Sequence, residues 1–168
     1  MTDKQSNSPD QEETGITVRV YGIMIHESGK ILVCDEYYYG RLFTKFPGGG
    51  MQLGESTRDC LIREWHEELD QYIIIVEHVY TSDIIQNYPF RNDVQVISIY
   101  YLVKPLTALQ VPVSDTPFDF DPADDLPHRI SLRWIDFRSF SANCMTLPAD
   151  RIAASVIIAQ IDSNMDRY

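Results

Sequence analysis

The sequence has 168 residues and a formal net charge of −11, and 44% of its residues are hydrophobic. This length suits one domain with a hydrophobic core rather than two, and we expect residues 15–168 to form that domain after a polar, disordered tail over residues 1–14. The acidic composition excludes a protein that grips a nucleic-acid polymer, because such binding requires a basic surface. No apolar segment approaches the length of a membrane helix, and the first residues lack the apolar core of a secretory signal. We therefore expect a cytoplasmic protein without a membrane partner.

The N-terminal third of the chain predicts strands joined by a short turn. Residues 17–25 (TVRVYGIMI) are rich in β-branched and aromatic side chains, and residues 30–35 (KILVCD) continue this pattern after a turn-like segment. The two segments predict a β-hairpin. Residues 36–46 hold several aromatic and basic side chains, and we expect a loop there. Such a loop suits the stacking of a flat ring and the neutralisation of phosphate, and it equally suits simple anchoring by hydrophobic side chains.

An amphipathic helix is predicted after the glycine-rich segment at residues 48–50. Ser56 or Thr57 can cap it, and it extends to about Leu69. With 3.6 residues per turn, Ile62, Trp65 and Leu69 point toward the core. The helix is therefore expected to pack through this apolar face.

The other face of this helix is acidic. Glu64, Glu67 and Glu68 follow the i, i+3, i+4 spacing that places side chains next to one another. Like charges at this spacing repel, so we expect a positive partner that the sequence does not supply. Carboxylates without paired imidazole or thiolate ligands suit hard cations, above all Mg²⁺ or Mn²⁺. With glycines that allow close backbone approach, the pattern indicates metal-assisted attack of water on a phosphoanhydride.

The second half of the chain predicts three more strands and a helix. Residues 73–79 form the first strand, and a polar segment at 81–93 follows it. Residues 94–103 are almost continuously apolar, which is typical of a strand covered on both faces. Residues 107–128, rich in proline and aspartate, show no regular pattern, and residues 130–137 form the last strand.

A C-terminal helix is predicted to begin near Pro148 and to end near Asp162. Its packing face consists of Ile152, Val156, Ile157 and Ile161. Strands interrupted by one helix and closed by another indicate a mixed sheet between two helices.

The three cysteines, Cys34, Cys60 and Cys144, are odd in number and scattered. Their spacing fits neither a zinc site nor a disulfide framework. We expect reduced thiols.

The central stretch resembles a known family. Gly49, Glu55 and the run Arg63-Glu64-Trp65-His66-Glu67-Glu68 keep the spacing of the Nudix box, the signature of hydrolases of nucleoside diphosphates linked to another moiety, and the approach PGGGMQLGES is similar to that of the family. The resemblance implies an α+β fold, an α/β/α sandwich with a Nudix-like mixed β-sheet between helices. It also implies a pyrophosphatase that uses Mg²⁺ or Mn²⁺.

The resemblance also implies roles for individual residues. Arg63 is expected to hold the helix in place through the outer acid Glu55 and so to support catalysis. Catalysis and metal binding are expected to involve Glu64, Glu67 and Glu68, with Glu55 approaching the metal and Gly49 or Gly50 supplying a carbonyl oxygen.

Two positions depart from the family pattern, since Asp70 replaces the closing glycine of the box and Gln71 replaces an aliphatic residue. Asp tolerates the left-handed conformation better than most residues, so the turn is expected to survive. Tyr72 or Ile73 is expected to supply the missing packing.

Three functional hypotheses remain open at this point. The first is metal-dependent hydrolysis of a small nucleotide, the second a Nudix-like nucleotide-binding or sensor module without turnover, and the third an isomerase acting on a diphosphate. The general base is either Glu64 or an acid within residues 115–125. The sequence is also compatible with a homodimer.

The substrate is not determined by the sequence. Arg41 and Lys45 are candidates to contact phosphate, and Tyr38, Phe43 and Tyr88 are candidates to stack a base. The position of Tyr88 resembles dinucleoside-polyphosphate hydrolases, whereas the adjacent proline is loosely similar to ADP-ribose hydrolases.

Overall fold

The computed structural model describes residues 15–109, 111–121, 123 and 125–165, so the tail expected at residues 1–14 lies outside the described part. The strands of one mixed sheet are β1 (Gly15–His26), β2 (Lys30–Tyr38), β3 (Arg41–Lys45), β4 (Gly48–Gly50), β5 (Ile73–Thr81), β6 (Asn87–Tyr88), β7 (Arg91–Pro105), β8 (Val113–Ser114) and β9 (His128–Asp136). The helices are α1 (Thr57–Leu69) and α2 (Pro148–Met165), with short 3₁₀ turns η1 (Phe137–Ser139) and η2 (Ala142–Cys144) before α2.

The sheet runs in the order β5-β7-β1-β2-β9-β8, with β3, β4 and β6 added to β2, β1 and β7. Strands β1 and β7 are parallel along almost their whole length, from Gly15 opposite Val94 to Met24 opposite Val103. Strands β8 and β9 are also parallel, and the other pairs are antiparallel. The expected mixed sheet is therefore confirmed.

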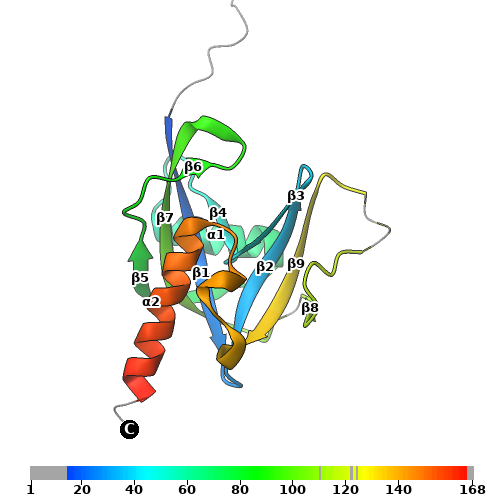
Figure 1. Ribbon diagram of the computed structural model, residues 1–168, viewed down its shortest axis with the longest axis vertical. Coiled ribbons are helices and arrows are strands. Elements are labelled where there is room, and N and C mark those ends of the chain that lie inside the picture. The colour runs from blue at the N-terminus through cyan, green and yellow to red at the C-terminus, as the bar shows by residue number, and fades with distance from the viewer. Residues whose placement is uncertain (1–14, 110, 122, 124, 166–168) are drawn as a thin grey trace, which may run out of the picture.

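The two helices cover opposite faces of the sheet, with α2 in front of β1 and β7 and α1 behind them in the view of Figure 1. Separate hydrophobic clusters lie under each helix. Ala153 and Ile157 of α2 pack in the first cluster, and Leu61, Trp65 and Leu69 of α1 pack in the second. As predicted from its apolar sequence, β7 contributes to both clusters, which confirms the sandwich of helices around a sheet.

Strand β1 divides one of its edges between two partners. Its first half pairs with β4, placing Arg19 opposite Gly50, and its end pairs with β2, placing Ile25 opposite Ile31. Beyond this short hairpin contact β2 leaves β1 and pairs with β3 and β9 instead. Figure 1 shows β2, β3 and β9 splayed away from β1 and β7.

The prediction of a loop over residues 36–46 is wrong, because this segment continues β2 and returns as β3 in a second hairpin. The turn lies at Tyr39 and Gly40, whose φ angles are +43° and +83°. Two-residue hairpin turns of type I′ require positive φ at both central residues. Tyrosine is rarely found in that conformation. Of the two turn residues, only Gly40 is therefore of a type that indicates a tight turn.

Helix α1 confirms the predicted extent, but one of its core residues is assigned wrongly. It buries Cys60, Leu61, Trp65 and Leu69, whereas Ile62 is 37% exposed. Residues 61, 65 and 69 form a strict i, i+4, i+8 line, and Ile62 lies beside this line toward solvent.

Helix α2 begins at the predicted proline. Its most deeply buried side chains are Ala149, Ala153, Ala154 and Ile157, while the predicted Ile152, Val156 and Ile161 are half-buried. Small residues therefore allow this helix to lie close to the sheet.

Two other expectations concern the cysteines and membrane-spanning helices. Cys34, Cys60 and Cys144 are free thiols, as predicted. Within the described part of the chain, no helix has the length and apolarity needed to cross a membrane.

Candidate active site

Helix α1 is fixed at its N-terminus by a capping box. The Ser56 hydroxyl accepts a hydrogen bond from the Asp59 backbone at 3.1 Å, and the Asp59 carboxylate accepts one from the Ser56 backbone at 3.4 Å. These bonds satisfy backbone groups that a helix end otherwise leaves without partners. The helix therefore begins at a defined residue, which fixes the position of its acidic face.

The C-terminus of α1 shows how the chain accommodates the two departures from the family pattern. Asp70 adopts the left-handed conformation with φ of +45°, and its N–H donates to the carbonyl of His66 at 3.1 Å. Gln71 is fully buried, and its amide nitrogen donates to the carbonyls of Tyr72 and Thr107. The turn expected at Asp70 is confirmed, and Gln71 occupies its own buried position.

Of the two residues expected to supply the missing packing, Ile73 is buried and Tyr72 is 52% exposed. Only Ile73 therefore contributes to the core at the end of α1.

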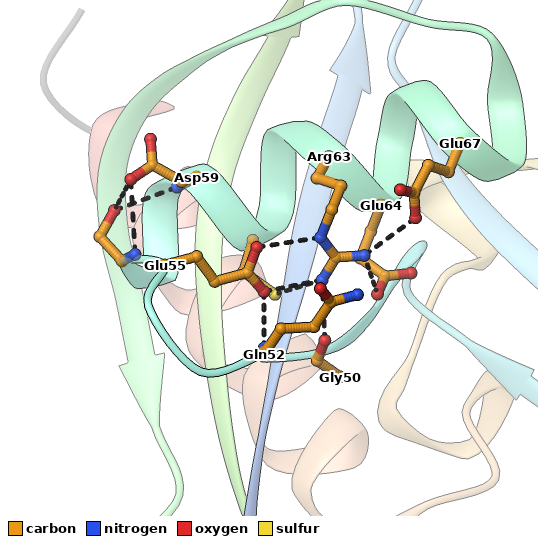
Figure 2. Close-up of polar contacts among 9 residues, drawn as sticks. Gly50, Gln52, Glu55, Asp59, Arg63, Glu64 and Glu67 are labelled. Atoms are coloured by element: carbon orange, nitrogen blue, oxygen red, sulfur yellow. Dashed lines mark hydrogen bonds and ion pairs between the residues drawn. The ribbon is translucent and has the colours of Figure 1, made fainter.

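Arg63 connects the acidic face of α1 to the glycine-rich segment (Figure 2). Its guanidinium makes two hydrogen bonds to Glu55, at 2.9 and 2.7 Å, and one to the carbonyl of Gly50 at 2.9 Å. Nη1 donates to Glu64 and to Glu67, at 2.9 Å in each case. Arg63 therefore supplies part of the positive charge that the acidic face requires, but within the described part of the chain it makes no hydrogen bond to Glu68. The expected external cation stays a prediction.

The same contacts hold Glu55 in its ionised form. Hydrogen bonds from Arg63 and from the backbone of Gln52 lower the pKa of the Glu55 carboxyl to about 2. Figure 2 shows Glu55, Gln52 and Gly50 gathered around the Arg63 guanidinium. Arg63 therefore ties the loop, β4 and α1 into one unit.

The glycines of β4 let α1 approach the backbone closely. A Cβ atom on Gly49 would overlap the Glu64 carboxylate, so only glycine leaves room for that carboxylate against the strand. Gly48 has φ of +142°, and a Cβ there would collide with the backbone of Val20 in β1. Gly48 therefore requires glycine for both space and conformation, whereas a Cβ at position 49 would displace the flexible carboxylate of Glu64.

The oxygen atoms gathered here suit a hard divalent cation in kind. The Glu64 carboxylate lies against Gly49 of β4, and Glu67 and Glu68 follow on the same helix. Carboxylate and carbonyl oxygens are the ligands that Mg²⁺ and Mn²⁺ prefer. Among the described residues, no three His, Cys, Asp or Glu side chains stand close enough to hold an ion in their present positions. Arg63 engages Glu64 and Glu67, so a cation at this site would compete with its guanidinium.

A cavity of about 140 Å³ opens beside α1 in the space between the two groups of strands. Its walls are aromatic and cationic, with acids at two positions. The lining includes Arg19 and Tyr21 from β1, Glu36 and Tyr38 from β2, Phe43 and Lys45 from β3, Glu68 from α1, Tyr88 from β6, Phe90, and His128 from β9.

Glu68 joins this cavity to the acidic face of α1. Much of the residue remains in contact with solvent, yet desolvation of its carboxyl against the cavity wall raises its pKa, and Lys45 partly opposes the shift. Glu68 therefore differs from Glu64 and Glu67, whose carboxylates face Arg63.

Lys45 and Glu36 form a buried ion pair in the cavity wall. Nζ of Lys45 lies 2.9 Å from the Glu36 carboxylate, and the two side chains are 6% and 13% exposed. Burial opposes both charges, but each partner stabilises the other, so the pKa of Lys45 is raised and that of Glu36 is lowered. His128 contacts the second oxygen of Glu36 at 2.9 Å.

The predicted substrate contacts are partly gathered at this cavity. Phe43, Lys45 and Tyr88 line it, as does Tyr38. Arg41 is not among the described lining residues, because its guanidinium donates to the carbonyl of Pro89 at 2.8 Å and lies 5.5 Å from the ring of Phe90.

Several residues of the cavity were not predicted from the sequence, namely Arg19, Tyr21, Glu36, Gln86 and His128. Only β1 offered a signal. Arg19 is a cation within an otherwise apolar segment, and Tyr21 lies two positions later on the same face of the strand. The other residues come from separate strands and turns.

Beneath the cavity region lies Asp150, which is fully buried in the first turn of α2. One carboxyl oxygen accepts a hydrogen bond from the backbone of Phe46 at 3.4 Å, and the other has no partner among the described residues. Burial raises the pKa of Asp150 to about 7, although the Phe46 bond and Lys45 oppose the shift.

The acidic segment at residues 115–125 is the alternative source of a general base. Asp115 lies 3.4 Å from Lys30, at the end of β2 opposite to the end that forms the cavity. Asp124 is outside the described residues.

Comparison with known proteins identifies the fold and the family. The family model described as "NUDIX domain" matches residues 15–141. No curated protein matches the sequence. The structure is similar to the solution structure of the ORF135 protein of Escherichia coli, with 20% identity, a TM-score of 0.64, and coverage of 87% of this chain and 91% of that chain. It is also similar to a NUDIX hydrolase from Nitrosomonas europaea, with 16% identity, a TM-score of 0.62, and coverage of 86% and 89%.

A third similar structure is a MutT NUDIX hydrolase from Burkholderia pseudomallei, with 17% identity, a TM-score of 0.59, and coverage of 84% of this chain and 98% of that chain. At these identities the structures establish the fold alone. The domain match extends from the start of β1 through the last strand of the sheet and includes the whole glycine and glutamate segment. The resemblance first seen in that segment is thereby confirmed, and the chain belongs to the Nudix family.

Proposed function

We propose that the protein hydrolyses a phosphoanhydride bond in a nucleoside diphosphate linked to another moiety, with Mg²⁺ or Mn²⁺ as cofactor. The observation that carries this proposal is the joining of two features at Glu68. This residue belongs to the acidic face of α1 and also lines a cavity with aromatic and cationic walls. Both features suit a nucleotide. A cation held by the acids and the cationic side chains of the wall would offset the charge of its phosphates, and the aromatic wall offers flat apolar surfaces to its base.

The residues of the acidic face have distinct roles in this proposal. Glu64, Glu67 and Glu68 would hold the cation together with a carbonyl of Gly49 or Gly50. When bound, the cation supplies positive charge that offsets the charge developing on the phosphoryl oxygens.

Arg63 acts as a positioning residue. Its hydrogen bonds to Glu55 and to the Gly50 carbonyl hold the strand against the helix, while those to Glu64 and Glu67 orient the carboxylates. Without a fixed guanidinium the acids would repel one another and separate.

The cavity wall supports the choice of a nucleotide. Tyr38, Phe43 and Tyr88 present rings to the cavity, and Phe90 packs against all three, with ring centroids 4.6, 5.8 and 5.9 Å away. Mutual packing of this kind holds aromatic side chains in fixed orientations. A base entering the cavity would therefore meet preorganised rings.

The test measures product release from a panel of nucleoside diphosphate derivatives, with and without Mg²⁺, for the wild type, Glu64→Gln and Glu68→Gln. We expect metal-dependent turnover by the wild type and a decrease of at least about 100-fold in kcat for both variants. Glu77→Gln is the matched control, because Glu77 is an exposed acid on β5 and is not among the described residues that line the cavity. The control should retain wild-type turnover.

Turnover in excess chelator, or turnover by either glutamine variant equal to that of the wild type, would contradict the assigned site. Tight nucleotide binding by the wild type with no product formation in any condition would favour the binding or sensor module instead.

A further inference from the structure

Two cationic side chains line the cavity, Lys45 and Arg19, and they differ in how their donors are used. Nζ of Lys45 lies 2.9 Å from the carboxylate of Glu36 and donates to the Gly48 carbonyl at 3.3 Å. Its positive charge is thus matched by a buried anion of the protein. A phosphate that approached Lys45 would have to compete with Glu36 for that charge.

Arg19 uses only part of its guanidinium. Nε donates to the Tyr21 hydroxyl at 2.9 Å, and among the described residues neither Nη1 nor Nη2 has a hydrogen-bonding or ionic partner. The fork formed by these two nitrogens is the geometry that binds two oxygens of one phosphate group. Arg19 therefore retains the donors that an anionic ligand needs, and Glu36, which forms its ion pair with Lys45, acts on the Arg19 charge only through space.

The orientation of this fork is restrained by aromatic rings. The guanidinium carbon lies 6.0 Å from the ring centroid of Tyr21 and 5.8 Å from that of Tyr88. With the Nε bond, these contacts hold the guanidinium plane against the wall of the cavity. A binding group held in place loses less entropy when its ligand arrives.

The fork also lies at the junction of the two parts of the site. Arg19 is opposite Gly50 in the pairing of β1 with β4, and a Cβ atom on Gly50 would lie 3.6 Å from Nη1. The carbonyl of the same glycine accepts the hydrogen bond from Arg63. A phosphate between Arg19 and the acidic face would therefore lie beside the aromatic wall on one side and beside α1 on the other.

We propose that Arg19 binds a phosphate group of the substrate through Nη1 and Nη2 and thereby selects nucleotides over nucleosides. Lys45 and Arg41, the two cations expected from the sequence, then serve the structure of the wall through Glu36 and Pro89. The assignment rests on the proposed function, because it takes the ligand to be a nucleotide. The ligand class is an aromatic base joined to at least one phosphate.

The competing explanation is that Arg19 only braces the rings of Tyr21 and Tyr88. Binding measurements separate the two roles, since a brace affects ligands with and without phosphate equally. The probes are the α,β-methylene analogues of the adenine, guanine, cytosine and uracil nucleoside diphosphates and the four parent nucleosides. Binding is measured by calorimetry in Mg²⁺ for the wild type, Arg19→Gln, Arg19→Lys and Arg58→Gln.

Arg58 is the matched control. Its guanidinium also lies over a tyrosine ring, 5.4 Å from the centroid of Tyr101, but Arg58 is not among the described residues that line the cavity. Loss of a cation over an aromatic ring is therefore reproduced without loss of a cavity cation.

We expect the wild type to bind at least one analogue more tightly than its nucleoside, and Arg19→Gln to weaken analogue binding by about 10- to 100-fold while leaving nucleoside binding unchanged. Arg19→Lys should recover part of the loss, because lysine keeps the charge without the fork. Arg58→Gln should bind like the wild type. If Arg19→Gln does not fold, the comparison of Arg19→Lys with the wild type carries the test, with a smaller loss confined to the phosphorylated probes.

Equal weakening for analogue and nucleoside, no weakening for either, or no preference of the wild type for the phosphorylated probe would each overturn the assignment. The analogues resist hydrolysis, so this result is independent of turnover. Arg19-dependent binding in a protein without turnover would retain the inference and reject the hydrolase. Hydrolysis with wild-type kcat and KM in Arg19→Gln would retain the hydrolase and reject the inference.

Discussion

Replacement of Asp150 by Asn should change how the stability of the protein depends on pH. The carboxyl is fully buried, it receives one hydrogen bond from the Phe46 backbone, and burial raises its pKa to about 7. In the unfolded chain the pKa of this group returns to the ordinary value near 3.8. Between these two values the folded state binds more protons than the unfolded state. The free energy of unfolding contributed by Asp150 therefore falls as pH rises through this window and is constant above it.

The size of the effect follows from the two pKa values. A difference of about three pH units at about 1.4 kcal/mol each gives a total near 4 kcal/mol. Roughly 2 to 3 kcal/mol of this falls between about pH 5 and about pH 8.5, where other parts of the protein are easier to keep folded. Asn cannot ionise, and its side-chain oxygen can still accept the Phe46 bond. Asp150→Asn should therefore gain stability relative to the wild type as pH increases.

Urea unfolding at a series of pH values measures this difference directly. The informative quantity is the free energy of unfolding of Asp150→Asn minus that of the wild type, because contributions from all other titrating groups cancel. Ile157→Val, a buried substitution on the same helix, is the control and should cost about 0.5 to 1.5 kcal/mol at every pH. A difference between Asp150→Asn and wild type that stays constant across the series would refute the reasoning.

Three further predictions concern the unit formed by β4 and α1. Gly49→Ala should lower kcat/KM by about 10- to 100-fold while changing the free energy of unfolding by less than about 1 kcal/mol. The reason is that the new methyl group displaces the movable carboxylate of Glu64 rather than backbone. Steady-state kinetics and urea unfolding measure the two effects, and unchanged kinetics would contradict the prediction. Asp70→Gly should stabilise the protein by roughly 0.5 to 1 kcal/mol in urea unfolding, since glycine accepts the left-handed conformation without strain, whereas Asp59→Gly should destabilise it by removing the capping box. Arg63→Lys should lose about 1 to 3 kcal/mol of stability, because an ammonium cannot reproduce the planar set of donors, and wild-type unfolding of this variant would refute the positioning role.

The parts of the structure that were predicted from the sequence depend on neighbours in the chain. The acidic face of α1, its capping by Ser56 and its end at Asp70 lie within one helix, whose geometry follows from residue spacing alone. The contact of Arg63 with Glu55, eight residues earlier, was expected from the resemblance to the Nudix box. Local order thus made the acidic half of the site predictable.

The cavity depends on pairings between distant strands, and the sequence does not specify them. Arg19 of β1, Glu36 of β2 and His128 of β9 meet because β2 leaves β1 and pairs with β9. A period of two indicates which face a strand side chain takes but not which strand lies next to it. The turn at Tyr39 and Gly40 was missed for a related reason, because tertiary context imposes the left-handed conformation on a tyrosine.

The change of partner along one edge of β1 has an evolutionary consequence. Strand β4, which pairs with one part of this edge, carries the glycines that adjoin α1. Strands β2, β3 and β9, which diverge from β1, carry much of the cavity wall. Substitutions in the diverging strands can reshape the wall without altering the hydrogen bonds of Arg63, which involve only α1 and the segment before it. Substitutions in β2, β3 and β9 can therefore change which ligands the cavity binds, while the acidic face of α1 and its contacts with Arg63 stay the same.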